Sequence, residues 1–109
     1  MTREQIFEIT RHFFGQALRV DARHTRLSLK SAGTNFHRAV VTVEFGARHF
    51  EVEISRPDNR IKLVEITTHK KFRFDHRNPI NGFALKEQRS ERLIRNHSLK
   101  DYLPTEKGE

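Results

Sequence analysis

The stretch 38-RAVVTVEFGARHFEVEIS-55 decides the fold, because apolar and polar residues alternate on both sides of Gly46-Ala47. Alternation with a period of two is typical of a strand with one buried face, and glycine at the first position of a two-residue loop favours a type II′ hairpin turn. If Phe45 pairs with Arg48, apolar residues meet apolar partners along one face, which predicts a β-hairpin in this register. The matched pairs are Val43 with Phe50, Val41 with Val52, and Ala39 with Ile54.

Two further strands are predicted beside this hairpin. The stretch "TRLSLKS", residues 25–31, alternates leucines with polar residues and predicts a strand that precedes it. After it, "RPDNR", residues 56–60, has the composition of a tight turn, and "IKLVEITT", residues 61–68, predicts a further strand. Pairing Ile54 with Ile61 again matches apolar partners. The same register sets Val52 opposite Leu63 and Glu53 opposite Lys62.

The strand at residues 61–68 has apolar residues on both faces. Val64 and Ile66 are out of phase with Leu63, so they point away from the face that Leu63 shares with the hairpin. Either a bulge redirects the strand, or both of its faces are covered. We expect the second arrangement, because the C-terminal segment predicts a helix that could cover the other face.

Helices are predicted at both ends of the chain. The opening "MTREQIFEITRHFFGQAL", residues 1–18, has a capping-box pattern at Thr2 and Gln5 and apolar residues at helical spacing, although Gly15 favours an end near Phe14. The stretch "FALKEQRSERLIRNH", residues 83–97, has a helix-forming composition and is strongly basic.

The predicted fold class is therefore α+β. An N-terminal amphipathic helix packs on an antiparallel meander of about four to five strands, and a basic helix follows at the C-terminal end. Residues 1–103 are expected to form a single domain, and residues 104–109 a frayed tail.

The net charge of +7 is concentrated in one block of the sequence. Residues 60–100 contain eleven Lys or Arg and four Asp or Glu, whereas residues 1–59 contain nine and seven. Such a block attracts polyanions, nucleic acid above all, or an acidic protein surface, although charge also serves solubility. The chain has no cysteine and no apolar run long enough to cross a membrane, which predicts a cytoplasmic protein with no membrane partner.

The stretch "KKFRF", residues 70–74, interleaves cations with aromatic rings. On a strand, Phe72 and Phe74 share one face while Lys71 and Arg73 share the other. We expect the rings to pack in the core and the cations to remain available for phosphate, although the arginines after residue 83 also fit a solvated helix face. The candidate binding residues are Lys70, Lys71, Arg73, Arg77, Arg89, Arg92 and Arg95.

The sequence predicts no catalytic residue, no cofactor and no metal site. Pro57-Asp58 followed by Glu65 resembles the carboxylate pattern of restriction-type endonucleases, but Thr67 stands where that pattern has its lysine. On the predicted hairpin, Glu44 lies opposite His49, a pairing that is commoner as charge-balanced decoration of a sheet than as a metal ligand set.

Three functions remain open from the sequence. The first is a small non-enzymatic module that binds nucleic acid, DNA or RNA, through phosphate contacts. The second is a protein-interaction factor, such as an inhibitor or accessory subunit, that docks its basic face on an acidic surface of a nucleic-acid-handling protein. The third is a homodimer that completes the weak apolar stripe of the predicted helix at residues 83–97 or pairs an exposed sheet edge.

Overall fold

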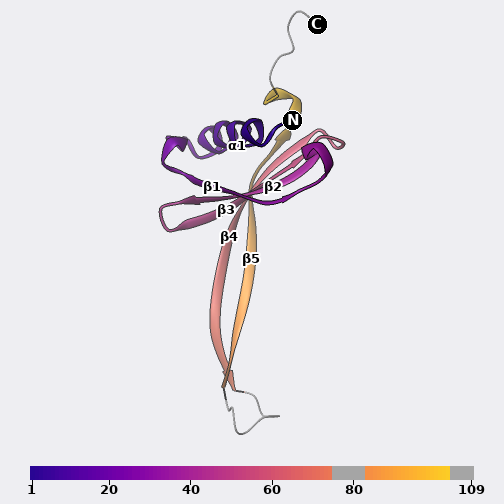
Figure 1. The fold of residues 1–109 in the computed structure, drawn as a ribbon. Helices are drawn as coiled ribbons and strands as arrows, with labels where there is room; N and C mark the ends of the chain where they lie inside the picture. The colour runs from indigo at the N-terminus through magenta and orange to yellow at the C-terminus, as the bar shows by residue number, and fades with distance from the viewer. Residues whose placement is uncertain (75–82, 104–109) are drawn as a thin grey trace, which may run out of the picture.

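The computed structural model describes residues 1–74 and 83–103, with side chains described for residues 1–68 and 88–103. Helix α1 (Arg3–Leu18) packs on one face of a five-stranded antiparallel sheet with the order β1-β2-β3-β4-β5 (Figure 1). The predicted α+β class and meander are confirmed. The strands are β1 (Arg26–Ala32), β2 (Arg38–Phe45), β3 (Arg48–Ser55), β4 (Arg60–Phe74) and β5 (Phe83–Ser98), and 3-10 turns lie at Ala22–His24, Thr34–Phe36 and Leu99–Asp101.

Helix α1 begins as predicted but extends further than the sequence suggested. Thr2 and Gln5 form a reciprocal capping box, with hydrogen bonds of 2.8 and 3.2 Å. The predicted end near Phe14 is wrong, because the helix continues to Leu18. At Gly15 the departing chain passes so close that an added Cβ would lie 3.2 Å from the Val20 carbonyl oxygen. Glycine here therefore permits a close backbone approach rather than ending the helix.

The central hairpin has the predicted register. Phe45 lies opposite Arg48, and each apolar pair expected between β2 and β3 is present. Gly46 has a φ of +61°, whereas Ala47 is not among the positive-φ residues, which is the combination of a type II′ turn. The register predicted between β3 and β4 is also confirmed, including Ile54 opposite Ile61.

The core lies between α1 and the face of the sheet that we call the helix-side face. Phe14 on α1 packs edge-on against Phe50 of β3, with ring centroids 4.9 Å apart. Phe13, Leu63 and Leu99 are also fully or almost fully buried, and Leu99 comes from the turn after β5. Burial of these large side chains supplies most of the free energy that holds α1 on the sheet.

The predicted basic helix at residues 83–97 is wrong, because this segment forms strand β5 and only a 3-10 turn follows it. β5 makes fifteen residue pairs with β4. A helix here would have had only a narrow apolar stripe to bury, whereas as a strand the segment pairs along the whole of β4, whose outer edge would otherwise lack backbone partners. Helix propensity is a weak preference that tertiary pairing overrides.

The predicted cover over both faces of β4 is also wrong, since the helix that was to provide it is strand β5. Val64 is nevertheless only 4% exposed on the far face, the face opposite α1. A bulge is present, but in β5: Leu63 lies opposite Arg95 and Val64 opposite Leu93, so Ile94 is the extra residue and packs against the core.

β4 and β5 continue together well beyond the rest of the sheet. The pairing of β3 with β4 stops at Ile66, whereas β4 and β5 form eight further pairs, from Thr67 with Ser90 to Phe74 with Phe83. Figure 1 shows this two-stranded segment, which we call the ribbon, extending away from the sheet. The predicted packing of the Phe72 and Phe74 rings concerns side chains outside the described ones.

The strand assignment of β5 can be tested with engineered cysteines, because the chain has none of its own. Thr67→Cys with Ser90→Cys places two thiols at directly opposite positions, within the Cα separation that a disulfide requires. We expect mild oxidation to close this disulfide within the monomer, observed as loss of free thiol and of two hydrogen atoms from the intact mass. The control pair, Thr67→Cys with Asn96→Cys, should stay reduced. Equal cross-linking of both pairs would contradict the register.

Candidate nucleic-acid interface

The register of β4 and β5 divides the ribbon and its base into two faces of different charge. Alternate residues of a strand share a face, and directly opposite residues on the neighbouring strand share it with them. Glu65 lies opposite the core residue Phe50, which places it on the helix-side face. By this register, the helix-side positions are those of Glu65, Thr67, His69, Lys71 and Arg73 with their partners Arg92, Ser90, Gln88, Lys86 and Ala84. The far-face positions are those of Ile66, Thr68, Lys70, Phe72 and Phe74 with Glu91, Arg89, Glu87, Leu85 and Phe83.

Two arginines converge on one carboxylate at the base of the ribbon. Arg48 donates from Nε and Nη2 to the two oxygens of Glu65, at 2.8 and 2.9 Å, and Arg92 Nη2 donates to Oε1 at 2.8 Å. The Arg48 guanidinium also lies 4.9 Å from the centroid of the Phe50 ring, which helps to fix its orientation. These three charged residues, the Glu65 cluster, join β3, β4 and β5 and carry a net charge of +1.

The electrostatics of the Glu65 cluster favour the ionised carboxylate. Hydrogen bonds from Arg48 and then Arg92 lower the pKa of Glu65 from its ordinary 4.5 to about 2, against a smaller opposing effect of burial. The same contact raises the pKa of Arg48. The Glu65 side chain is 16% exposed, whereas that of Arg92 is 69% exposed. The cluster therefore hides its negative charge and presents a positive one.

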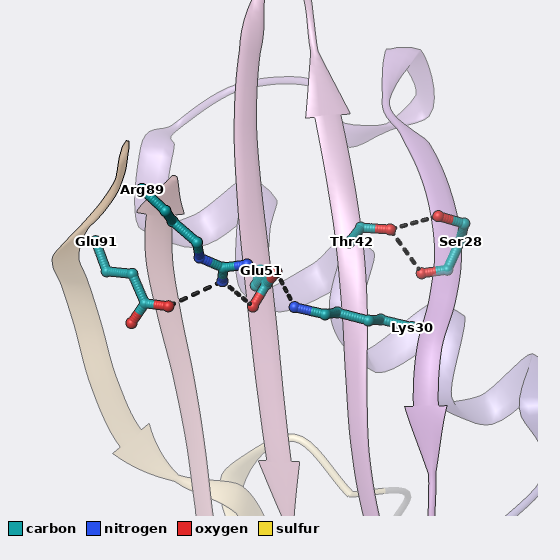
Figure 2. A network of polar contacts seen from close by, with 6 residues as sticks. All are labelled: Ser28, Lys30, Thr42, Glu51, Arg89 and Glu91. Atoms are coloured by element: carbon teal, nitrogen blue, oxygen red, sulfur yellow. Dashed lines mark hydrogen bonds and ion pairs between the residues drawn. The ribbon is translucent and has the colours of Figure 1, made fainter. Parts of the chain in front are cut away.

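The far face is organised by a different carboxylate. Figure 2 shows Glu51 of β3 between Lys30 of β1, at 2.8 Å, and Arg89 of β5, at 2.9 Å, while Arg89 also contacts Glu91 at 2.8 Å. Burial raises the pKa of Glu51, but the hydrogen bonds from Lys30 and Arg89 outweigh it, so the pKa is lowered overall. Arg89 is thus held by two carboxylates and ties the edge strand β5 to the centre of the sheet.

The structure separates the candidate binding residues into groups. The backbone register assigns Lys71, Arg73 and Arg92 to helix-side positions, and Lys70 and Arg89 to far-face positions. Arg95 is exposed beside the bulge, opposite Leu63, and Arg77 lies outside the described residues.

Arg48 is the functional candidate that sequence reasoning missed. It is distant in sequence from the basic block and stands directly after the hairpin turn. The signal that could have found it is the predicted register of β3 and β4, which, when extended past Val52 and Leu63, sets Phe50 opposite Glu65. Because side chains two residues apart on a strand share a face, Arg48 comes within reach of Glu65.

A groove lies where β3 ends and β4 continues alone with β5. It has a volume of about 540 Å³, and its lining includes Arg48, Thr67 and Thr68 together with the carboxylates Glu44, Glu51 and Glu65. The Glu65 cluster therefore borders a concave surface rather than a flat one. Because three carboxylates line this concavity, the exposed Arg92 outside its lining, rather than the groove itself, offers the contact for an anionic group.

The carboxylates that resembled a nuclease pattern do not come together. Asp58 lies in the turn between β3 and β4, where it accepts a hydrogen bond from Ser55, while Glu65 binds Arg48 and Arg92. His49 lies 3.8 Å from Glu44 as a single exposed pair. Within the described part of the chain, no group of three or more His, Cys, Asp or Glu residues is arranged to hold a metal ion.

Comparisons of the chain with protein-family models, with curated proteins and with solved structures give no significant match. None of the described helices is both long enough and apolar enough to span a membrane. The proposals below therefore rest on the geometry and charge of this chain alone.

Glu65→Gln should remove a pH-dependent contribution to stability. Because the folded pKa is depressed, the ionised carboxylate stabilises the fold above its ordinary pKa of 4.5, and this contribution is lost as the pH falls toward 2. Both arginines are partly exposed, so we expect a loss of about 1 kcal/mol at pH 7 rather than the full value of the pKa shift.

The measurement is the free energy of unfolding in urea at several pH values between 7 and 2. The free energies of unfolding of the variant and the unmodified protein should become equal as the pH falls. Glu44→Gln, which alters a more exposed carboxylate on the far face, is the matched control and should change stability by less than about 0.5 kcal/mol. If the difference in the free energy of unfolding between Glu65→Gln and the unmodified protein is the same at pH 7 and pH 2, the effect comes from packing rather than from charge.

Proposed function

We propose that this chain is a non-enzymatic module that binds nucleic acid through the helix-side face of the β4–β5 ribbon. The observation that carries the proposal is the separation of charge between the two faces. The helix-side positions include Lys71, Arg73, Lys86 and Arg92, whereas the ribbon-region carboxylates Glu87 and Glu91 occupy the far face. A row of cations in which carboxylates are few is the footprint of phosphate binding.

Glu65, the one carboxylate among the paired helix-side positions of β4 and β5, supports the same proposal. Glu65 is neutralised by Arg48 and Arg92, so it does not repel a polyanion. It also holds the two guanidiniums in fixed positions, which lowers the side-chain entropy that phosphate binding would otherwise cost. Glu65 thus acts as a positioning residue for the arginines.

The second candidate function is a protein interaction, which the sequence assigned to the basic face; the far face offers an apolar contact for such a partner instead. Leu93 is 56% exposed there, and Ile66 is half-buried nearby on the same face. Together they form a small apolar area, and a protein contact on this side of the sheet would cover it. Such a partner would depend on Leu93, whereas nucleic acid would depend on the cations of the opposite face.

Triple substitution Lys71→Ala, Arg73→Ala and Lys86→Ala should weaken binding to nucleic acid. Losing up to three phosphate contacts lowers the slope of log affinity against log salt by up to about 3, and we expect affinity to fall at least about tenfold at low salt. The measurement is fluorescence anisotropy with labelled nucleic acids across a salt series.

The matched control removes the same charge elsewhere: Arg11→Ala, Arg26→Ala and Arg56→Ala are exposed positions on α1, β1 and the β3–β4 turn. It should keep its salt slope and bind within about threefold of the unmodified protein. Equal losses in both triple variants would mean that only net charge matters. Absence of binding to any nucleic acid at low salt would contradict the proposed function, and loss of a protein partner in Leu93→Ala would favour the second candidate.

A further inference from the structure

We propose that the preferred nucleic acid is B-form duplex DNA, with the ribbon lying in the major groove and the Glu65 cluster contacting the phosphate backbone at the groove's edge. This inference rests on the proposed function and names its ligand. It is carried by the dimensions of the ribbon, by the distribution of residue types over its two faces, and by the contacts of Arg48, Glu65 and Arg92.

The ribbon has the dimensions of a groove-binding element. Its eight residue pairs span about 25 Å at the usual rise of a strand. That length matches about seven base pairs of duplex at 3.4 Å each. The major groove of B-form DNA is about 12 Å wide and accepts a two-stranded β-ribbon. Two-stranded ribbons also twist strongly, so one face can follow a groove that winds around the duplex axis.

Within the described residues, no third strand pairs with the ribbon. β3 stops pairing at Ile66, and the last buried residue of β4 among those with described side chains is Val64. Thr67 and Thr68, the first ribbon residues of β4, are exposed, as is Ser90 on β5. A duplex can therefore approach the ribbon beyond the sheet without first displacing α1 from its core contacts.

Two other nucleic-acid forms fit less well. The major groove of A-form RNA is deep and too narrow for protein elements to read, so a ribbon of this width is excluded from it. Binding of single strands uses aromatic rings beside cations on one surface. The register assigns Phe72 and Phe74 to the far face, where Lys70 is set opposite Glu87 and Arg89 is bound by Glu51 and Glu91, whereas Lys71 and Arg73 belong to the helix-side face.

The Glu65 cluster supplies a preorganised phosphate contact at the base of the ribbon. Arg92 contacts Glu65 through Nη2 and is 69% exposed, so other N–H groups of its guanidinium remain available to a phosphate. Arg48 uses two nitrogens on Glu65 and lies at the neighbouring groove of the protein surface. When the Glu65 cluster at the base of the ribbon contacts the DNA phosphates, the ribbon extends from that point into the major groove of the DNA.

The experiment compares binding of the unmodified protein to four labelled probes at one salt concentration. They are a DNA duplex of about 20 base pairs, the RNA duplex of the same sequence, the single DNA strand, and the DNA duplex with glucosylated hydroxymethylcytosine, whose sugar fills the major groove. We expect the unmodified DNA duplex to bind at least about tenfold more tightly than each of the other three probes. Arg92→Ala should lower affinity for the DNA duplex and reduce its salt slope by about 1.

The outcomes separate this inference from the proposed function. Equal or tighter binding of the RNA duplex or the single strand, or undiminished binding of the glucosylated duplex, overturns the groove assignment while nucleic-acid binding stands. Failure of every probe to bind overturns both. If Arg92→Ala keeps both its urea unfolding midpoint and its salt slope, the Glu65 cluster does not contact the phosphate backbone.

Discussion

Backbone pairing along β4 is the constraint on which the rest of the structure depends. This strand has fifteen residues; its first part pairs with β3 on one side, and all of it pairs with β5 on the other. The first part builds the core, because Ile61 and Leu63 meet the hairpin and α1. The second part has only β5 as its partner within the described residues, which turns the end of a sheet into a ribbon. The same strand thus links the stabilising core to the surface that we propose binds nucleic acid.

Two carboxylates determine which charges this sheet presents. Glu51 on the far face and Glu65 on the helix-side face each accept hydrogen bonds from two cationic side chains, and the pKa of each is lowered as a result. Glu51 binds Arg89, so that arginine serves mainly to fasten β5. Glu65 instead binds Arg92, whose side chain stays largely exposed. Two similar ion-pair networks therefore serve different purposes, one structural and one that leaves positive charge available.

The central hairpin and its register could be predicted from the sequence because their signals are local. Gly46 fixes the turn, and a shift of one residue would expose Val41, Val43, Phe50 and Val52. The secondary structure of residues 83–97 could not be predicted in the same way, because arginines at every third position fit a solvated helix as well as a strand. The deciding interaction is pairing with β4, which a single segment does not reveal.

The candidate site also has a part that could be predicted from local sequence and a part that could not. Lys71 and Arg73 could be assigned to one face by alternation alone, and β4 retains that alternation. The Glu65 cluster joins residues from three strands, so it becomes visible only when the registers of β3, β4 and β5 are combined. The contact of Arg48 with Glu65 could be inferred from the predicted register of β3 and β4. The contact of Arg92 with Glu65 could not, because residues 83–97 were expected to form a helix.

The central claim is that the helix-side face of the ribbon and its base forms the binding surface. The most direct measurement is an amide NMR titration of the isotope-labelled protein with duplex DNA. The account predicts that the largest shift changes fall on Arg48, Thr67, Lys71 and Arg92, with smaller changes at Ser28, Thr42 and Glu53 on the far face away from the ribbon. Changes centred on those far-face residues or on α1, with the ribbon unaffected, would contradict it.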